Sequence, residues 1–301
     1  MINPLRPLGS PSPTRSRILW EGGAAVIEAE PPNLTVCPPV WQGPAMHGAF
    51  IKTWLFKQVV ESTNDLAKQV VEVGLGDCPV LVSAECQTRG RGRGSHTWWS
   101  DEGSLTFTIA IDPQTHGIRI EHEPKVALAT AVAVIDALLY WIPVDLVRLR
   151  WPNDVEIAGR KIAGILPERI DTTRGPRLLI GIGINVSTEF AKAPEEVRRM
   201  AVSLKEHAER YSETSDRERL LARVVAQFES TLGRLAADDP GLAARWDQLD
   251  ALRDRLVRLN LGSQVIQGIG RGIEPSGALV LACESGLKAF HGGQILRDEP
   301  T

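Results

Sequence analysis

The chain has 301 residues, 43% of them hydrophobic and 24% charged, a balance typical of a globular protein with a substantial core. Its formal net charge of −3 argues against a general nucleic-acid-binding protein, because such proteins normally carry a basic excess. The four cysteines form no C-x-x-C pair and show no metal-ligand spacing, so we expect buried thiols rather than disulfides or a zinc site.

Residues 1–51 are rich in proline, glycine and small side chains and show no helical period. We expect an extension that is loosely ordered or docked on the body of the protein. No apolar export signal follows Met1, which favours a cytoplasmic protein. The longest apolar stretch, residues 126–144, is interrupted by Thr130 and Asp136, so it predicts a buried helix rather than a membrane span.

The next predicted element is a helix that starts at Ser62-Thr63-Asn64-Asp65, which has the S-x-x-D pattern of a capping box. The apolar residues that follow, Leu66, Ala67, Val70 and Val71, are spaced for one face of a helix. A strand-like run at residues 80–85 comes next and leads into the most informative segment of the chain.

That segment is Gln87-Thr88-Arg89-Gly90-Arg91-Gly92-Arg93-Gly94, here called the arginine loop. Each arginine offers a planar donor fork suited to carboxylate or phosphate, and each glycine lets the backbone approach an anion. The sequence therefore predicts a structured cationic loop that closes over an anionic ligand. A disordered RNA-binding segment is the alternative, which the shortness of the run and its flanking strands disfavour. Trp98, just beyond, fits either a nucleobase stack or a place in the core.

The following elements alternate between strand and helix. Strands are predicted at residues 105–111, 147–151, 155–157, 161–166 and 178–185, and a long helix at 124–141. Glycines thin the last of these strands, which indicates that another group approaches it closely. A charged helical pattern runs from about residue 195 to 252, and short strands with glycine turns after it predict a small β barrel. Together they indicate an α/β domain followed by an all-β domain.

Two further candidates for chemistry are Trp151-Pro152-Asn153-Asp154 and Lys161. Pro152 restricts the backbone before a polar pair, although Asn-Asp is also a common turn sequence. Lys161 lies in an otherwise apolar stretch, so its ammonium needs an anionic partner, either a ligand or the carboxylate of Asp154 or Glu168. No phosphate-binding loop, zinc-hydrolase, esterase or complete dinucleotide motif is present.

Taken together, the motifs resemble those of the biotin protein ligases over about residues 52–298. In chain order they occupy residues 62–64, 87–94 with Trp98, 151–154, 160–166, 181–186, 277–279 and 286–296. The resemblance implies a central mixed sheet with helices in residues 52–252, as in class II aminoacyl-tRNA synthetases, and an SH3-like β barrel in residues 253–301. Lipoate ligases and octanoyltransferases share the catalytic fold and are the main alternative, although the arginine loop and the C-terminal segment fit biotin ligases better.

By that resemblance, ATP and Mg²⁺ activate biotin to biotinoyl-5'-AMP, and biotin passes to a lysine of the biotin carboxyl carrier domain of a carboxylase. Lys161, Arg91 and Arg93 would be catalytic. The implied biotin-binding residues are Ser62, Thr63, Asn64, Gln87, Gly90, Arg91, Gly92, Arg93, Lys161 and Gly164. The implied ATP-binding residues are Arg93, Trp98, Asn153, Lys161, Asn185 and Arg297. The Mg²⁺ ligands are not identified, and Asp154 is only a candidate.

Some features depart from the family pattern. Arg150 stands where a lysine is usual, and residues 95–97 replace a more basic continuation of the arginine loop. Nothing in residues 1–51 resembles a helix-turn-helix, so we predict a monofunctional ligase that binds neither operator DNA nor a membrane.

Overall fold

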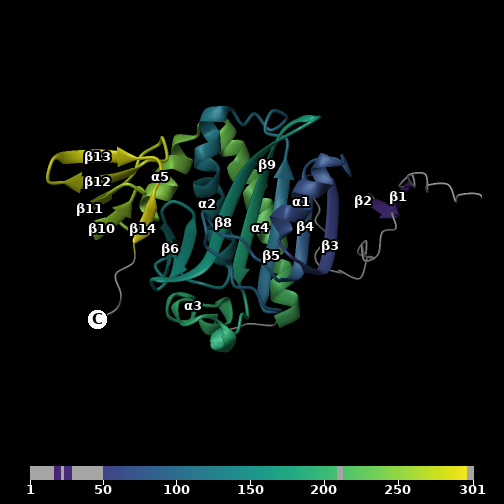
Figure 1. Ribbon diagram of the computed structural model, residues 1–301, viewed down its shortest axis with the longest axis horizontal. Coiled ribbons are helices and arrows are strands. Elements are labelled where there is room, and N and C mark those ends of the chain that lie inside the picture. The colour runs from purple at the N-terminus through teal and green to yellow at the C-terminus, as the bar shows by residue number, and fades with distance from the viewer. Residues whose placement is uncertain (1–16, 22–23, 29–49, 209–212, 297–301) are drawn as a thin grey trace, which may run out of the picture.

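The computed structural model describes residues 17–21, 24–28, 50–208 and 213–296 (Figure 1). Its centre is a seven-stranded mixed sheet, and a five-stranded antiparallel sheet is built from the C-terminal part of the chain. In Figure 1 the smaller sheet, drawn in yellow, lies at one end of the molecule beside α5. The predicted α/β body with an additional all-β unit is therefore confirmed, while the domain boundary at residues 252/253 stays a prediction.

The seven-stranded sheet has the order β3-β4-β5-β9-β8-β7-β6. Its strands are β3 (Thr53–Val60), β4 (Val80–Gln87), β5 (Ser104–Ile111), β6 (Val147–Arg150), β7 (Asp154–Ile157), β8 (Arg160–Thr172) and β9 (Gly175–Asn185). Only β3 and β4 run parallel, and the other neighbours are antiparallel. The predicted strands are present, and β8 with β9 forms a longer hairpin than the sequence pattern indicates.

Helices are α1 (Thr63–Glu72), α2 (Val126–Leu138), α3 (Glu195–Met200), α4 (Glu213–Ala236) and α5 (Pro240–Gln248), with 3-10 turns at Ile120–Lys125, Phe190–Lys192 and Leu204–Glu206. The helix predicted at 124–141 starts at Val126, directly after the 3-10 turn that contains Pro124. Within the described residues, no helix combines the length and apolar character needed to cross a membrane.

The two faces of the large sheet carry different side chains because each strand alternates in residue type. On one face, apolar residues such as Phe107 of β5 and Ile182 of β9 pack beneath α2, α4 and α5 and are almost completely buried. On the other face, α1 covers a smaller apolar cluster that includes Val80 and Val82. The rest of this second face carries glycine and polar residues, and it forms the candidate site described below.

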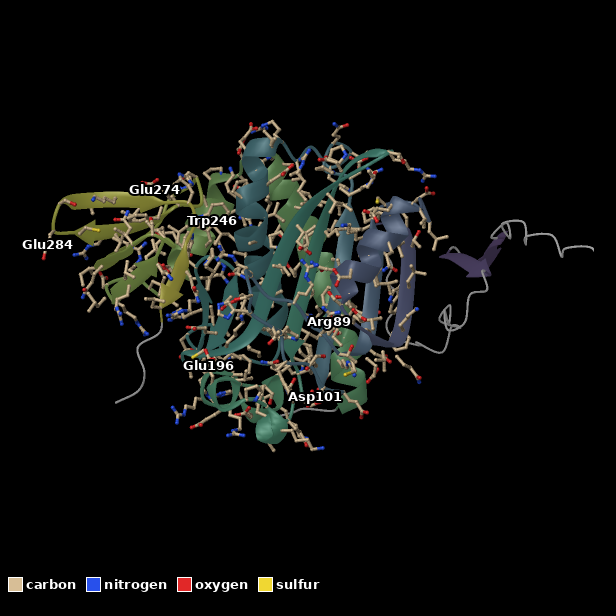
Figure 2. The ribbon with its side chains drawn as sticks, viewed as in Figure 1. Arg89, Asp101, Glu196, Trp246, Glu274 and Glu284 are labelled. Atoms are coloured by element: carbon tan, nitrogen blue, oxygen red, sulfur yellow. The ribbon has the colours of Figure 1, made fainter. Side chains whose placement is uncertain are left out.

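The C-terminal sheet has the order β13-β12-β11-β10-β14. Its strands are β10 (Leu256–Asn260), β11 (Val265–Ile273), β12 (Leu279–Cys283), β13 (Gly286–Phe290) and β14 (Gln294–Leu296). Trp246 of α5 is 2% exposed and donates its indole N–H to the carbonyl of Glu274 at 3.3 Å, where α5 meets this sheet (Figure 2). In the extension, β1 (Arg17–Glu21) and β2 (Ala24–Glu28) form an antiparallel pair.

The start of α1 is capped differently from the sequence expectation. Ser62 is the N-cap residue, but its side chain makes no capping hydrogen bond, so the predicted capping box is wrong. Gln87 takes its place, since its Oε1 accepts the N–H of Thr63 at 2.7 Å. The expected partner, Asp65, instead binds Arg91 at 2.6 Å, because a guanidinium offers a carboxylate a stronger bond than a backbone amide does.

Asp250 lies at the junction between the large sheet and the C-terminal part of the chain. The N–H of Leu149 in β6 donates to the carbonyl of the residue before Asp250, and the N–H of the residue after Asp250 donates to the carbonyl of Leu149, each at 2.8 Å. The side chain of Asp250 is 7% exposed; Oδ1 accepts the N–H of Leu252, whereas Oδ2 is buried without a partner among the described residues. Burial therefore raises the pKa of this carboxyl to about 6.

We expect this group to make the protein less stable as the pH rises. A raised pKa means that folded Asp250 keeps a proton that the unfolded chain has released, so the stabilisation is lost as pH rises through about 6. Asp250→Asn removes this dependence. Urea denaturation should show the variant gaining about 1 kcal/mol on the wild type between pH 5 and pH 8. A constant difference across that range would contradict the assignment.

Candidate active site

The candidate site lies on the second face of the seven-stranded sheet, between the start of α1 and the arginine loop. In β9 the isoleucines face the core, so Gly181, Gly183 and Asn185 face the site. A cross-strand row on the same face joins Gly183 to Gly164 of β8 and to Asp154 of β7. Because two of these positions have no side chain, the sheet offers open floor there.

Side chains from other elements approach these glycines closely. A Cβ at Gly183 would lie 2.5 Å from Cε2 of Trp98, and a Cβ at Gly164 would lie 3.2 Å from Cζ3 of the same ring. A Cβ at Gly181 would overlap the side-chain oxygen of Asn64. The prediction that the glycines of β9 mark a close approach is confirmed, and the approaching groups are two of the predicted site residues.

The first turn of α1 forms a polar wall of the site. Ser62, Thr63 and Asn64 are all at most 4% exposed. Thr108 of β5, which is fully buried, donates to Asn64 Oδ1 at 2.6 Å and lies 2.9 Å from Thr63 Oγ1. Gln87, at the end of β4, accepts from the backbone and hydroxyl of Thr63. These residues are therefore brought together as the sequence analysis expects.

Glu168 of β8 completes this wall. Its Oε2 accepts from Asn64 Nδ2 at 2.7 Å, and its Oε1 binds the guanidinium of Arg91. Asn64 Nδ2 also donates to the carbonyl of Leu166 at 3.3 Å. The amide of Asn64 is thus held from both sides, with its oxygen toward Thr108 and its nitrogen toward β8.

The arginine loop is an ordered hairpin in this structure. Arg91 pairs with Thr97 in an antiparallel bridge, and two backbone hydrogen bonds of 2.8 Å join Gly92 to His96 and Trp98 to Gly90. Figure 2 marks the entry to this loop at Arg89. The structured-loop interpretation is therefore confirmed, and the hairpin carries Trp98 back over the sheet.

Arg91 turns toward the protein. Its guanidinium binds Asp65 and Glu168, and their charges raise its pKa even though burial acts in the opposite direction. A direct contact between Arg91 and a ligand carboxylate or phosphate stays a prediction.

The other end of the loop contacts the C-terminal sheet. Arg93 donates to the carbonyl of Gly293 at 3.3 Å, and His96 Nε2 lies 2.9 Å from Nε2 of Gln294. Burial lowers the pKa of Arg93, and the charge of Asp154 partly offsets that effect. Arg297, the predicted ATP contact in this region, lies outside the described residues.

Lys161 lies at the centre of these groups. Its Nζ is 2.7 Å from Oδ1 of Asp154 and 5.6 Å from the centroid of the Trp98 ring, and its side chain is 31% exposed. Of the partners left open by the sequence, Asp154 rather than Glu168 forms the ion pair. The ammonium therefore lies between a carboxylate of the sheet and the aromatic ring that the loop hairpin carries.

Two asparagines hold the backbone around Lys161. Asn185 Nδ2 donates to the carbonyl of Lys161 at 3.3 Å, and Asn153 Nδ2 donates to the carbonyl of Ile165 at 2.7 Å. The backbone carbonyl of Asn153 also accepts a hydrogen bond from the N–H of Ile165. Both residues lie at the site, as predicted, and their contact with a nucleotide stays a prediction.

Thr108 was not predicted as a site residue, Glu168 was considered only as a partner of Lys161, and Asp65 only as part of the helix cap. Thr108 had a signal, because it continues the alternation of polar and apolar residues that Ser104 and Thr106 begin, on the positions that alternate away from the core. No signal linked Glu168 or Asp65 to Arg91, since each reaches it only through the folding of distant segments.

Chemically, the arrangement can bind and activate anions. Lys161 lies beside Gly164 on the floor of glycine, whereas Arg91 and Arg93 lie on the loop, where Arg91 binds Glu168 and Arg93 donates to the carbonyl of Gly293. Trp98 adds an aromatic surface whose indole nitrogen is buried without a partner among the described residues. Such a site suits the binding of an anion, because the ammonium of Lys161 lies beside an open floor of glycine.

Comparisons with known proteins agree with this chemistry. Residues 56–185 match the family described as "Biotin/lipoate A/B protein ligase family", and residues 254–297 match the "Biotin protein ligase C terminal domain". The chain is similar to the bifunctional ligase/repressor BirA of Salmonella typhimurium, with 32% identity over 79% of this chain and 72% of that protein.

Two further relatives have similar coverage. The biotin–[acetyl-CoA-carboxylase] ligase of Mycobacterium tuberculosis is 31% identical over 67% of this chain and 73% of that protein. The solved structure of the biotin protein ligase from Aquifex aeolicus in complex with biotin and ATP superposes with a TM-score of 0.68 and 25% identity. That superposition covers 82% of this chain and 98% of the other.

Proposed function

The chain belongs to the biotin protein ligase family and uses ATP to attach biotin to a protein, and we propose that this reaction takes place beneath the arginine loop. Biotin would first become biotinoyl-5'-AMP, and a lysine of a biotin carboxyl carrier domain would then receive the biotinoyl group. The position of Lys161 between Asp154 and Trp98, on the glycine face of the sheet, carries the proposal.

In the first step an oxygen of the biotin carboxylate attacks the α-phosphorus of ATP, and the bond to pyrophosphate breaks. Lys161 would place its positive charge between the carboxyl and phosphoryl oxygens, leaving Asp154 as the two substrates arrive. Arg93, on the loop above, would face the same oxygens. Charges fixed in advance at such a point typically supply a large share of the catalysis.

The two substrates would occupy different parts of the floor. Ser62, Thr63, Asn64 and Gln87 would bind biotin at the α1 end, enclosed by the loop backbone from Gly90 to Arg93 and by Gly164. Trp98 would stack near adenine, with Asn153, Asn185 and Arg297 holding the nucleotide. The Aquifex relative, whose structure contains biotin and ATP, supports the binding of both molecules by this fold.

Mg²⁺ would arrive with the triphosphate. Among the described residues no group of three or more His, Cys, Asp or Glu side chains could enclose a metal ion. This fits Mg²⁺, which usually binds one or two carboxylates and keeps phosphate and water ligands. Asp154, beside Lys161, is the candidate ligand, and the ion would offset phosphate charge.

The second step delivers biotin to the carrier. The lysine amine of the carrier attacks the acyl carbon, the bond to AMP breaks, and the amine loses a proton. The relative named as an acetyl-CoA-carboxylase ligase supports a carboxylase as the partner. A cytoplasmic location fits a reaction that consumes ATP. We also propose that the chain does not bind operator DNA, and adenylate-dependent binding to a specific DNA sequence would contradict this.

An exchange assay tests the proposed function. The protein should incorporate labelled pyrophosphate into ATP when biotin is present and not when lipoate replaces it. Exchange that depends on lipoate would favour the related lipoate ligases instead. If no exchange occurs with either acid, the proposed function is contradicted.

Gly181→Ala should weaken biotin binding by about tenfold or more, because the added methyl group meets the side chain of Asn64 and displaces it from the polar wall. The dissociation constant for biotin can be measured by calorimetry. Gly233→Ala is the matched control, since nothing lies within 4 Å of a Cβ at that position. Equal affinities in the two variants would contradict the placement of biotin beside Asn64.

A further inference from the structure

Glu168 differs from the other carboxylates of the site in how its two oxygens are used. One oxygen binds the loop through Arg91, and the other binds the pocket wall through Asn64 at 2.7 Å. Its side chain is 26% exposed, and its bond to Asn64 is the more buried of the two. A single carboxylate therefore joins the arginine loop to the wall of the proposed biotin pocket.

The contact with Asn64 fixes the direction of a pocket amide. Asn64 is 3% exposed, and its oxygen already accepts from Thr108 at 2.6 Å. A carboxylate accepts only, so Glu168 can bind the amide nitrogen of Asn64 and not its oxygen. Without Glu168, the amide would lose the stronger of its two nitrogen bonds, because the other, to Leu166, is longer at 3.3 Å.

The contact with Arg91 holds the loop. Arg91 lies in the bridged part of the hairpin, opposite Thr97, so fixing its guanidinium fixes the strand that returns Trp98 to the sheet. Asp65 also binds Arg91, but it contributes less, because its side chain is 44% exposed and exposed ion pairs are weak. Glu168 is the partner that is both more buried and bonded to the pocket.

We propose that Glu168 is a positioning residue that fastens the arginine loop to the biotin end of the pocket, so that loop closure and the orientation of Asn64 are set together. The proposal rests on the proposed biotin ligase function. The expected consequence is that the protein retains the adenylate. While Glu168 holds Arg91, this reactive intermediate stays enclosed until a carrier lysine reaches it.

The test compares Glu168→Gln, Glu168→Ala and Asp65→Asn in the full chain. Each protein is supplied with biotin and Mg-ATP, and the rate at which biotinoyl-adenylate leaves is measured after removal of free substrates. The KM for biotin and the kcat of pyrophosphate exchange are measured in parallel, together with the urea midpoint of unfolding.

Glu168→Gln is the decisive variant because it keeps the size of the side chain. Its amide oxygen still accepts from Asn64, while its amide nitrogen offers Arg91 no acceptor. We expect adenylate release to accelerate about tenfold or more, with the KM for biotin within about threefold of wild type. Glu168→Ala should accelerate release to a similar extent and also raise the KM for biotin about tenfold. Asp65→Asn should change either value less than about threefold.

Two results would overturn the proposal. One is wild-type release from a Glu168→Gln protein that unfolds at the wild-type midpoint; the other is an equal acceleration in Asp65→Asn. Both require a wild type that exchanges pyrophosphate with biotin. A wild type without that exchange would overturn the proposed function itself, and with it this role, so the two failures are distinguishable.

Discussion

Lys161→Ala is expected to slow adenylate formation by about two to three orders of magnitude, because it removes the charge proposed to bridge the carboxyl and α-phosphoryl oxygens. Loss of one such preorganised group typically raises the barrier by about 3–4 kcal/mol. The measurement is a single-turnover assay of biotinoyl-adenylate formation from biotin and Mg-ATP. The KM for biotin should rise far less than kcat falls, because the wall of Thr63, Asn64 and Gln87 is left in place.

Two controls separate this effect from damage to the fold. Lys68→Ala removes a lysine of α1 that is 51% exposed and should leave the rate unchanged. Lys161→Arg keeps the charge but spreads it over a planar group, so only partial activity is expected. A Lys161→Ala protein that forms adenylate within threefold of the wild-type rate would remove Lys161 from the mechanism.

Arg93→Gly is expected to release the adenylate and to biotinylate unrelated lysines. The substitution removes a cation from the loop, breaks its contact with Gly293, and adds backbone freedom at the same position. Release should accelerate at least about tenfold, since a hydrogen bond from a charged group is lost together with loop order. Mass spectrometry of a bystander protein such as albumin, incubated with enzyme, biotin and Mg-ATP, reports the escape.

Arg89→Gly is the matched control, because it makes the same change at the start of the same loop. Arg89 is 76% exposed and pairs with Glu61 on the surface, so retention and selectivity should stay near wild type. If Arg89→Gly and Arg93→Gly label bystander lysines equally, general loop flexibility rather than the Arg93 side chain controls retention.

Much of the fold followed from local alternation in the sequence. The strand at residues 178–185 alternates glycine with isoleucine, which predicts a close approach on one face and a core on the other, and both are present. The apolar spacing after residue 62 placed the start of α1, but not its cap. The predicted cap was wrong because Asp65 and Gln87 each bind a residue that is distant in sequence, and the local motif carries no information about either contact.

The site was predicted only in part, because some of its contacts join segments that are distant in sequence. Lys161 and the arginine loop were recognisable from residue type and spacing, and Lys161 was expected to need an anionic partner. Which carboxylate it would choose depended on the hairpin register, which places Asp154 opposite Gly164 and turns Glu168 toward Asn64. Trp98 was undecided between a nucleobase stack and a core position, because only the hairpin brings it over Gly183.

Native mass spectrometry is the most direct test of the central idea, that the cations under the loop join biotin to AMP. The protein is incubated with biotin and Mg-ATP, desalted, and weighed without denaturation. A complex that carries one biotinoyl-adenylate, and that loses it when a carrier domain is added, is the expected result. A protein that carries ATP and biotin side by side, with no adenylate formed, would contradict the account.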